Sequence, residues 1–233
     1  MALLEVCCGN LESVDAAVLG GAQRIELCSD LEVDGLTPPA GWIRTVKARY
    51  PSLTVHVLIR PRAGDFRYDD GELDDMVRQA ETALDAGADG IVTGCLTENG
   101  DIDIPAMERI LRGMDGRKPS RKVSVTFHRA FDVCRRPFEA MERVIGLGCA
   151  RILTSGQRPS VTEGIGMIRE LRRRADGRIL LLPGGGVTPD NAAQILSLTG
   201  CTEIHASASE TLSGKKVTSA ARVAAILKAI EST

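Results

Sequence analysis

The chain has 233 residues, of which 43% are hydrophobic and 26% charged, a composition typical of a folded globular protein and not of a disordered segment. Its formal net charge of -2 excludes the strongly basic surface that nucleic-acid binding needs, and no apolar run is long enough to span a bilayer. We therefore expect a single domain over residues 1–233, with neither nucleic acid nor a membrane as a partner.

The beginning of the chain and its cysteines favour a cytoplasmic protein. The first residues, MALLEVCC, lack the basic segment of a secretory signal and pass directly into strand-like sequence. Seven cysteines are spread over a chain long enough to fold without disulfide bonds, so we interpret them as reduced thiols.

Eight short apolar runs follow one another along the chain, each long enough for a β-strand. They cover residues 3–7, 24–28, 55–59, 90–94, 123–127, 151–155, 179–183 and 203–207. The segments between them have helical character, most clearly DGELDDMVRQAETALDAG, which has an acidic start, one apolar face and a glycine after its last turn. Strands that alternate with helices predict parallel βαβ units. Eight such units favour an α/β fold of the (βα)8 TIM-barrel type over an open doubly wound sheet.

A short repeat supports this architecture. GAQRI, GADGI, GCARI and GCTEI begin at residues 21, 87, 148 and 200, each where a helix ends and an even-numbered strand begins. The glycine suits the left-handed residue that ends many helices. A repeat at every second unit favours a closed barrel built from four double units.

Polar residues follow almost every apolar run. In a TIM barrel the active site lies at the carboxyl ends of the strands, so these residues are expected to share one site. They are Glu5, Glu26, Arg60, Arg62, His128, Arg129, Asp132, Thr154, Ser155, His205 and Ser207, with Gly184, Gly185 and Gly186 after the seventh strand.

His128 is the candidate for acid–base chemistry. It lies in VTFHRAFD, at the end of the fifth strand, with Asp132 four residues later. Because imidazole titrates near neutral pH, His128 is a candidate general acid or base. The alternative is a histidine whose ring is satisfied by neighbouring backbone. The arginines and carboxylates expected at the same mouth favour the functional role.

Glu5 and Glu26 each stand two residues before a cysteine, in LEVC and IELC, so each shares a strand face with that cysteine. If that face points into the barrel, both carboxylates need cationic partners, for which we take Arg60, Arg62 and Arg129 as candidates. The two glutamates either assist catalysis or belong to an ion-pair network that fills the top of the barrel.

Cys7 and Cys28 form a matching pair on neighbouring strands. Such strands lie about 4.8 Å apart, so both sulfurs are within reach of one soft ion such as Cu(I). The chain has no Cys-x-x-Cys spacing. Packing as small hydrophobic residues is therefore the alternative for this pair.

An anionic ligand is the other expected occupant of the mouth. Gly184–Gly186, together with Ser207 and the end of the eighth strand, can present free backbone N–H groups to a phosphate. Arg60, Arg62 and Arg129 add positive charge. The sequence thus predicts a small anionic or phosphorylated ligand, and we expect no organic cofactor.

The motifs together resemble those of the CutC family of copper homeostasis proteins. The matching segments, in chain order, are LEVCC, GAQRIELC, GLTP, IRPRAGDFRY, VTFHRAFD, RILTSGQ, PGGGV and EIHASA. The resemblance implies a cytosolic TIM barrel that commonly forms a homo-oligomer, a dimer or a tetramer, and is associated with copper handling. It implies Cu(I) binding in some members, with Cys7 and Cys28 at the positions of the ligands proposed for the family.

Three functions follow from these residues. The first is a Cu(I)-binding protein of copper homeostasis, which uses Cys7 and Cys28. The second is an enzyme that acts on a small anionic or phosphorylated substrate, with His128 as general acid or base, assisted by carboxylates such as Glu5, Glu26 and Asp132. The third is a non-catalytic scaffold stabilised by buried ion pairs.

Overall fold

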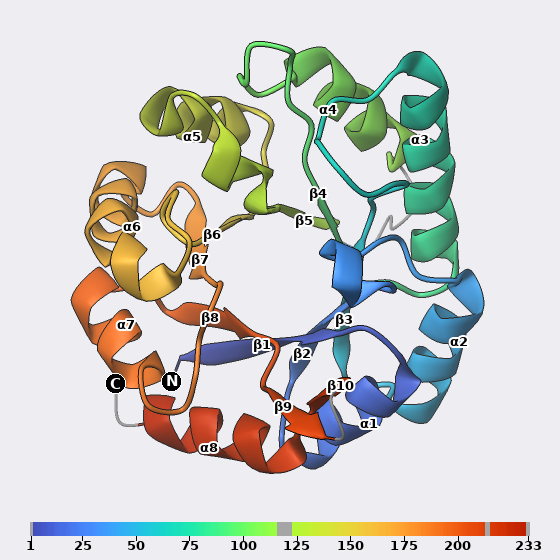
Figure 1. Ribbon diagram of the computed structural model, residues 1–233. Coiled ribbons are helices and arrows are strands. Elements are labelled where there is room, and N and C mark those ends of the chain that lie inside the picture. The colour runs from blue at the N-terminus through green and yellow to red at the C-terminus, as the bar shows by residue number, and fades with distance from the viewer. Residues whose placement is uncertain (1, 116–122, 213–214, 232–233) are drawn as a thin grey trace.

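Parallel strands form a ring in the computed structural model of the chain, which describes residues 2–115, 123–212 and 215–231 (Figure 1). The ring strands pair in the order β7-β6-β5-β4-β3-β2-β1-β8, and every pairing is parallel. β7 and β8 lie in contact and complete the ring. The strands are β1 (Leu3–Cys8), β2 (Arg24–Leu27), β3 (Thr54–Leu58), β4 (Gly90–Thr93), β5 (Ser124–Phe127), β6 (Arg151–Thr154), β7 (Leu180–Pro183) and β8 (Glu203–Ala206). The predicted (βα)8 barrel is confirmed.

Helices surround the ring on its outer side (Figure 1). They are α1 (Leu11–Leu19), α2 (Ala40–Arg49), α3 (Asp70–Asp85), α4 (Ile104–Gly113), α5 (Pro137–Gly146), α6 (Val161–Ala175), α7 (Ala192–Thr199) and α8 (Ala220–Ile230). The apolar core lies between them and the outward-facing strand residues, among which Val6, Ile25, Ile91 and Phe127 are fully buried. Within the described ranges, no helix is both long and apolar enough to cross a bilayer.

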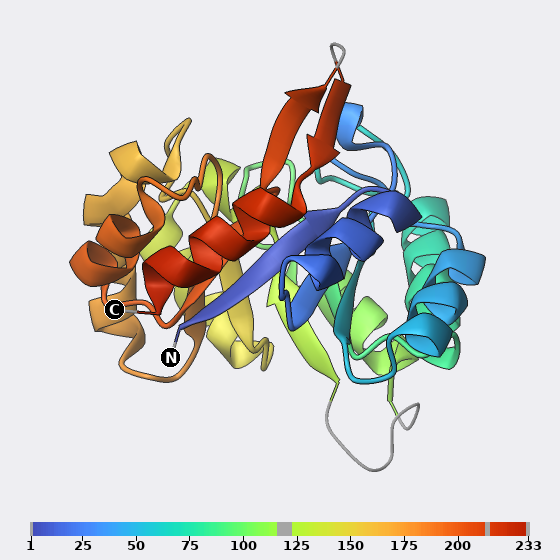
Figure 2. The same ribbon diagram turned by 90° about the horizontal axis from the view of Figure 1, so that it is seen from below.

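Three short elements interrupt the alternation of strands and helices. The 3-10 turns η1 (Leu31–Val33) and η2 (Arg129–Val133) follow β2 and β5. An antiparallel hairpin of β9 (Ser209–Leu212) and β10 (Lys215–Thr218) stands between β8 and α8 and projects from the barrel (Figure 2). This hairpin lies outside the eight strands that the apolar runs predict.

The repeated glycines end helices in the way that the sequence predicts. Gly21, Gly87, Gly148 and Gly200 all have positive φ, between 70° and 107°. Residues that have a side chain are strained in this left-handed region of φ, whereas glycine is not. The repeat therefore marks the four places where a helix turns back beneath the barrel into an even-numbered strand.

Candidate functional site

Charged side chains fill the interior of the barrel. Glu5 on β1 is completely buried, and its Oε2 lies 2.7 Å from Nε of Arg24 and 3.0 Å from Nδ1 of His56. Its Oε1 lies 2.9 Å from Nδ1 of His205. Burial alone would raise the pKa of Glu5, but hydrogen bonds with His205 and His56 and the charge of Arg24 hold that pKa well below its usual range.

The same network continues from Arg24 to other strands. The Arg24 guanidinium donates to Glu203 on β8 over 2.6 Å, and Nε of Arg151 on β6 donates to the same carboxylate over 2.6 Å. Arg151 also donates to the Ser124 hydroxyl on β5 over 2.6 Å. Buried carboxylates and guanidinium groups thus alternate across the barrel, which is the arrangement that makes buried charge tolerable.

The partners predicted for Glu5 are wrong. Arg60, Arg62 and Arg129 form no ion pair with it; Arg24 does, because Arg24 lies beside Glu5 in the register of β1 and β2. Arg24 precedes Glu26 by two residues, so it shares the inward face of β2. The ion-pair network, which was the alternative role for Glu5 and Glu26, is therefore present. Its members are residues of the strands.

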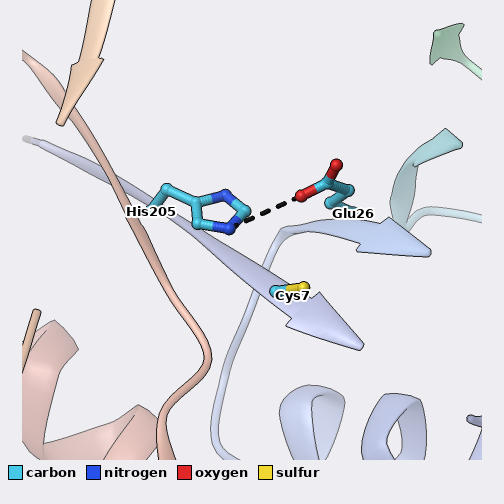
Figure 3. Close-up of side chains that lie close together, drawn as sticks. All are labelled: Cys7, Glu26 and His205. Atoms are coloured by element: carbon cyan, nitrogen blue, oxygen red, sulfur yellow. Dashed lines mark ion pairs between the residues drawn. The ribbon is translucent and has the colours of Figure 1, made fainter. Parts of the chain in front are cut away.

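Glu26, His205 and Cys7 come together on the mouth side of this network (Figure 3). The carboxylate of Glu26 lies 3.5 Å from Nε2 of His205, and the candidate ligand atoms of all three residues lie within 4.8 Å of one another. Burial raises the pKa of Glu26, and the charge of His205 lowers it in part. The resulting pKa is about 7. Burial alone would lower the pKa of His205, but hydrogen bonds with Cys7 and Glu5 and the two carboxylate charges raise it well above its usual value.

Cys7 and Cys28 are neighbours, as their spacing predicts. Their sulfur atoms lie 3.8 Å apart, and both side chains pack with Leu58 and Val92. The hydrogen bond with Cys28, together with burial, raises the pKa of the Cys7 thiol well above its usual range. All seven cysteines are free in the structure.

A cavity of about 390 Å³ opens beside these groups. Its polar lining residues come from the ends of five strands and from the turn after β2: Cys7, Glu26, Asp34, Arg60, His128, Arg129, Asp132 and His205. Its apolar lining residues are Leu31, Leu58, Phe66, Val133 and Leu153. The barrel therefore brings residues from positions 7 to 205 into one site, as the geometry of the fold requires.

His128 lines this cavity with a ring that is buried and hydrogen-bonded to the backbone. Its Nδ1 accepts a hydrogen bond from the backbone N–H of Ala130 over 3.2 Å, and its ring packs 4.8 Å from that of Phe66. Burial and the charge of Arg60 lower the pKa of His128 to about 3. In this arrangement the neutral ring presents Nε2–H as a donor, and the role of His128 as a general acid or base stays a prediction.

The buried neutral state of His128 predicts a pH-dependent stability. The pKa falls from about 6.5 in the unfolded chain to about 3 in the folded protein, so the unfolded chain binds more protons between these values. We expect this residue to lower the free energy of unfolding by up to about 1.4 kcal/mol per pH unit as the pH falls below 6.5. Urea unfolding of wild type and His128→Asn at pH 6.5 and 5 measures the difference. Parallel pH dependence of the two proteins would contradict the assignment.

Hydrogen bonds with Asp132 hold the loop after β6 in place. Its carboxylate accepts from the backbone N–H of Ser155 over 3.0 Å, from the Thr154 hydroxyl, and from Nε of Arg129 over 2.7 Å. The backbone N–H of Gln157 donates to it over 3.2 Å. Asp132, Thr154 and Ser155 thus hold one another at the edge of the cavity, and the catalytic role of Asp132 stays a prediction.

The family is decided by comparison with known proteins. The model of the CutC family matches residues 2–210. The chain belongs to the CutC family. It is 47% identical over 208 residues to a CutC family protein from Bacteroides thetaiotaomicron, covering 89% of this chain and 81% of that one. A CutC family protein from Chromobacterium violaceum is 45% identical over 206 residues, covering 88% and 81% of the two chains.

Solved structures agree with this assignment. The structure of a copper homeostasis protein CutC from Streptococcus agalactiae is 34% identical to the chain and superposes with a TM-score of 0.83, covering 89% of this chain and 99% of that one. Phosphoribosylanthranilate isomerase from Thermotoga maritima superposes with a TM-score of 0.64 at 14% identity, which shows a shared barrel fold alone. The CutC resemblance predicted from the motifs is therefore confirmed.

Some residues predicted for this CutC site lie elsewhere. Arg62 turns away to Glu72, with 2.5 Å between Nε and the carboxylate, and does not line the cavity. Gly184–Gly186 do not line it either, and the backbone N–H of Gly184 already donates to Thr154. Ser207 lines a different, larger cavity of about 1140 Å³ beside the hairpin. These residues do not form the single anion site that was predicted.

The basic partners inside the barrel were not predicted from the sequence. Arg24, His56 and Arg151 all lie on strands, within runs that were interpreted by their apolar residues. Arg24 could have been identified from the sequence. Side chains alternate between the two faces of a β-strand, so Arg24 lies on the same face as Glu26 and Cys28. The predicted homo-oligomer stays a prediction, since the structure is of one chain.

Proposed function

We propose that this CutC protein binds one Cu(I) ion through the thiolates of Cys7 and Cys28. The observation that carries the proposal is the distance of 3.8 Å between the two sulfurs. A metal–thiolate bond is about 2.3 Å long, as in zinc sites, so both sulfurs can reach one ion. The arrangement thus needs little movement of either strand to hold a metal.

The surroundings of the pair suit a soft ion. Leu58 and Val92 pack against the thiols, and a soft monovalent ion prefers thiolate and imidazole ligands to carboxylates. Nε2 of His205 lies within 4.8 Å of Cys7 Sγ and becomes a third donor once the ring has lost a proton. Glu26 belongs to the same group, but its oxygen is the donor that Cu(I) favours least. The name of the Streptococcus agalactiae protein, which refers to copper homeostasis, supports the proposal further.

We expect Cys7→Ser and Cys28→Ser each to weaken Cu(I) binding by at least tenfold, because each removes one of two soft ligands. Anaerobic titration of the reduced protein with Cu(I), in competition with a chromogenic chelator, measures the affinity. Cys8→Ala is the matched control. Cys8 neighbours Cys7 on β1 but points into the core outside the ring, so this variant should retain wild-type affinity. Unchanged affinity in both serine variants would refute the thiol-pair site.

Catalysis is a second candidate function, favoured by the meeting of Glu26, His205 and Cys7 on one wall of the cavity. In this alternative Glu26 transfers the proton instead of His128, and Arg60 holds the anionic substrate. The test is exchange of carbon-bound hydrogen of small carboxylates with deuterated water, followed by NMR. Exchange that is lost in Glu26→Gln supports the alternative, and absence of exchange with the wild type argues against it.

A further inference from the structure

Two buried N–H donors on the wall of the mouth cavity have no acceptor. Nε of Arg60 and Nε2 of His128 are both inaccessible and make no hydrogen bond in the described part of the chain. The two residues are only 4% and 5% exposed. Buried donors are almost always paired, so donors without acceptors on a cavity wall indicate a missing ligand.

Arg60 carries a charge that no carboxylate balances. Its terminal nitrogens donate to the backbone carbonyls of Val33 (2.7 Å), Gly35 (2.9 Å) and Gly64 (2.9 Å), all of which are neutral. Among residues 2–115, 123–212 and 215–231, none forms an ion pair with Arg60. These bonds use three of the five guanidinium N–H groups, and the Tyr68 hydroxyl is a further polar partner of Arg60. They fix the guanidinium but leave its full positive charge for an anion.

His128 supplies a second donor whose tautomer is set by the backbone. Because Nδ1 accepts from Ala130, the ring proton lies on Nε2. The ring of Phe66 lies close to both donor residues. Its centroid is 5.3 Å from Cζ of Arg60 and 4.8 Å from the centroid of the His128 ring. Arg60 and His128 therefore flank one aromatic side chain on the same wall.

The other lining residues of the cavity indicate the chemistry of the rest of the ligand. Leu31, Leu58, Val133 and Leu153 line it together with Phe66, so most of its surface is apolar. A volume of about 390 Å³ lies within the range of pockets that hold small organic ligands. The site thus suits an apolar body that carries one acceptor group.

We propose that this cavity binds a small monocarboxylate with an apolar body, whose carboxylate accepts hydrogen bonds from Nε of Arg60 and Nε2 of His128. Of the basic residues that line the cavity, Arg129 pairs with Asp132 and His205 with Glu5 and Glu26, whereas Arg60 forms no ion pair within the described residues. The charge of Arg60 and the neutral donor of His128 therefore match a single negative charge. Glu26, Asp34 and Asp132 also line the cavity and oppose a second charge, which disfavours a phosphate dianion. The site is independent of copper, because neither donor residue is a ligand of the proposed Cu(I) site.

Calorimetric titration of the metal-free, reduced protein tests the ligand class. The probes are acetate, 3-methylbutanoate and benzoate, with 3-methylbutanamide as the neutral match and inorganic phosphate as the dianion. We expect 3-methylbutanoate or benzoate to bind at least tenfold more tightly than acetate, the amide or phosphate. Equal binding of the amide, tighter binding of phosphate, or no binding of any carboxylate would overturn the proposal.

Variants of His128 test the donor itself. His128→Asn keeps an acceptor for the Ala130 N–H and loses the far donor, whereas the longer amide of His128→Gln restores an N–H near the position of Nε2. We expect the asparagine variant to bind at least tenfold more weakly and the glutamine variant to recover part of the loss. Arg62→Gln, outside the cavity, should bind as the wild type does. Wild-type affinity in a folded His128→Asn would overturn the assignment, and unchanged Cu(I) affinity in the same variant would separate this result from the copper proposal.

Discussion

Replacing Glu5 with glutamine is expected to lower the free energy of unfolding by about 3–5 kcal/mol. The substitution keeps the shape of the side chain and removes only its charge. That charge is fully buried and faces Arg24, His56 and His205 within 3.0 Å. Without it, the barrel interior contains positive groups that lack their central partner, and the cost of burying them is no longer offset.

An exposed ion pair provides the control for Glu5. Glu142 pairs with Arg178 at 2.7 Å, but their side chains are 52% and 46% exposed. We expect Glu142→Gln to change the free energy of unfolding by less than about 1 kcal/mol, because solvent screens the exposed pair. Urea denaturation at pH 7 measures both variants. A loss below about 1 kcal/mol for Glu5→Gln would show that the interior network does not stabilise the fold.

Replacing Gly164 with alanine is expected to cost about 3 kcal/mol or more. A Cβ atom at this position on α6 would lie 1.7 Å from the backbone oxygen of Ser155 and 3.0 Å from Cα of Gly156. Backbone atoms cannot rotate away as a side chain can, so α6 and the loop after β6 would have to separate. The loss should reach the cavity too, because this loop is tied to Asp132.

Gly166 lies on the same helix, and a Cβ atom added to it would have no neighbouring atom within 4 Å. We expect Gly166→Ala to raise the free energy of unfolding by about 0.5–1 kcal/mol, since alanine favours helix over the unfolded chain. Thermal unfolding of the two variants side by side gives the comparison. Equal and small effects would contradict the close contact between α6 and Ser155.

The fold could be predicted from the sequence because each strand and helix has a local signal. Apolar runs, helical faces and the repeated glycines at 21, 87, 148 and 200 each fix one step of the alternation, and the parallel barrel is the arrangement that buries them all. The proximity of Cys7 and Cys28 was predictable because both lie at the ends of adjacent strands, on the same face as the glutamates that precede them. The register was not predictable: it pairs Cys7 with Glu26, so the two cysteines meet diagonally, two residues out of register.

The partners within the site were not predictable to the same degree. Strand-end position indicates that a residue is near the mouth, but it does not indicate which way a long side chain turns. Arg60 bends to three backbone carbonyls, Arg62 bends outward to Glu72, and Arg129 binds Asp132. The state of His128 likewise depends on burial and on the Ala130 N–H, neither of which a linear sequence specifies.

The most direct test of the central claim, a two-thiolate Cu(I) site at the barrel mouth, is X-ray absorption at the copper edge. The measurement uses reduced wild-type protein loaded anaerobically with one equivalent of Cu(I), beside Cys7→Ser and Cys8→Ala loaded in the same way. The account predicts two sulfur neighbours around copper in the wild type and in Cys8→Ala, and fewer in Cys7→Ser. A copper environment without sulfur, or one that is identical in all three proteins, would contradict it.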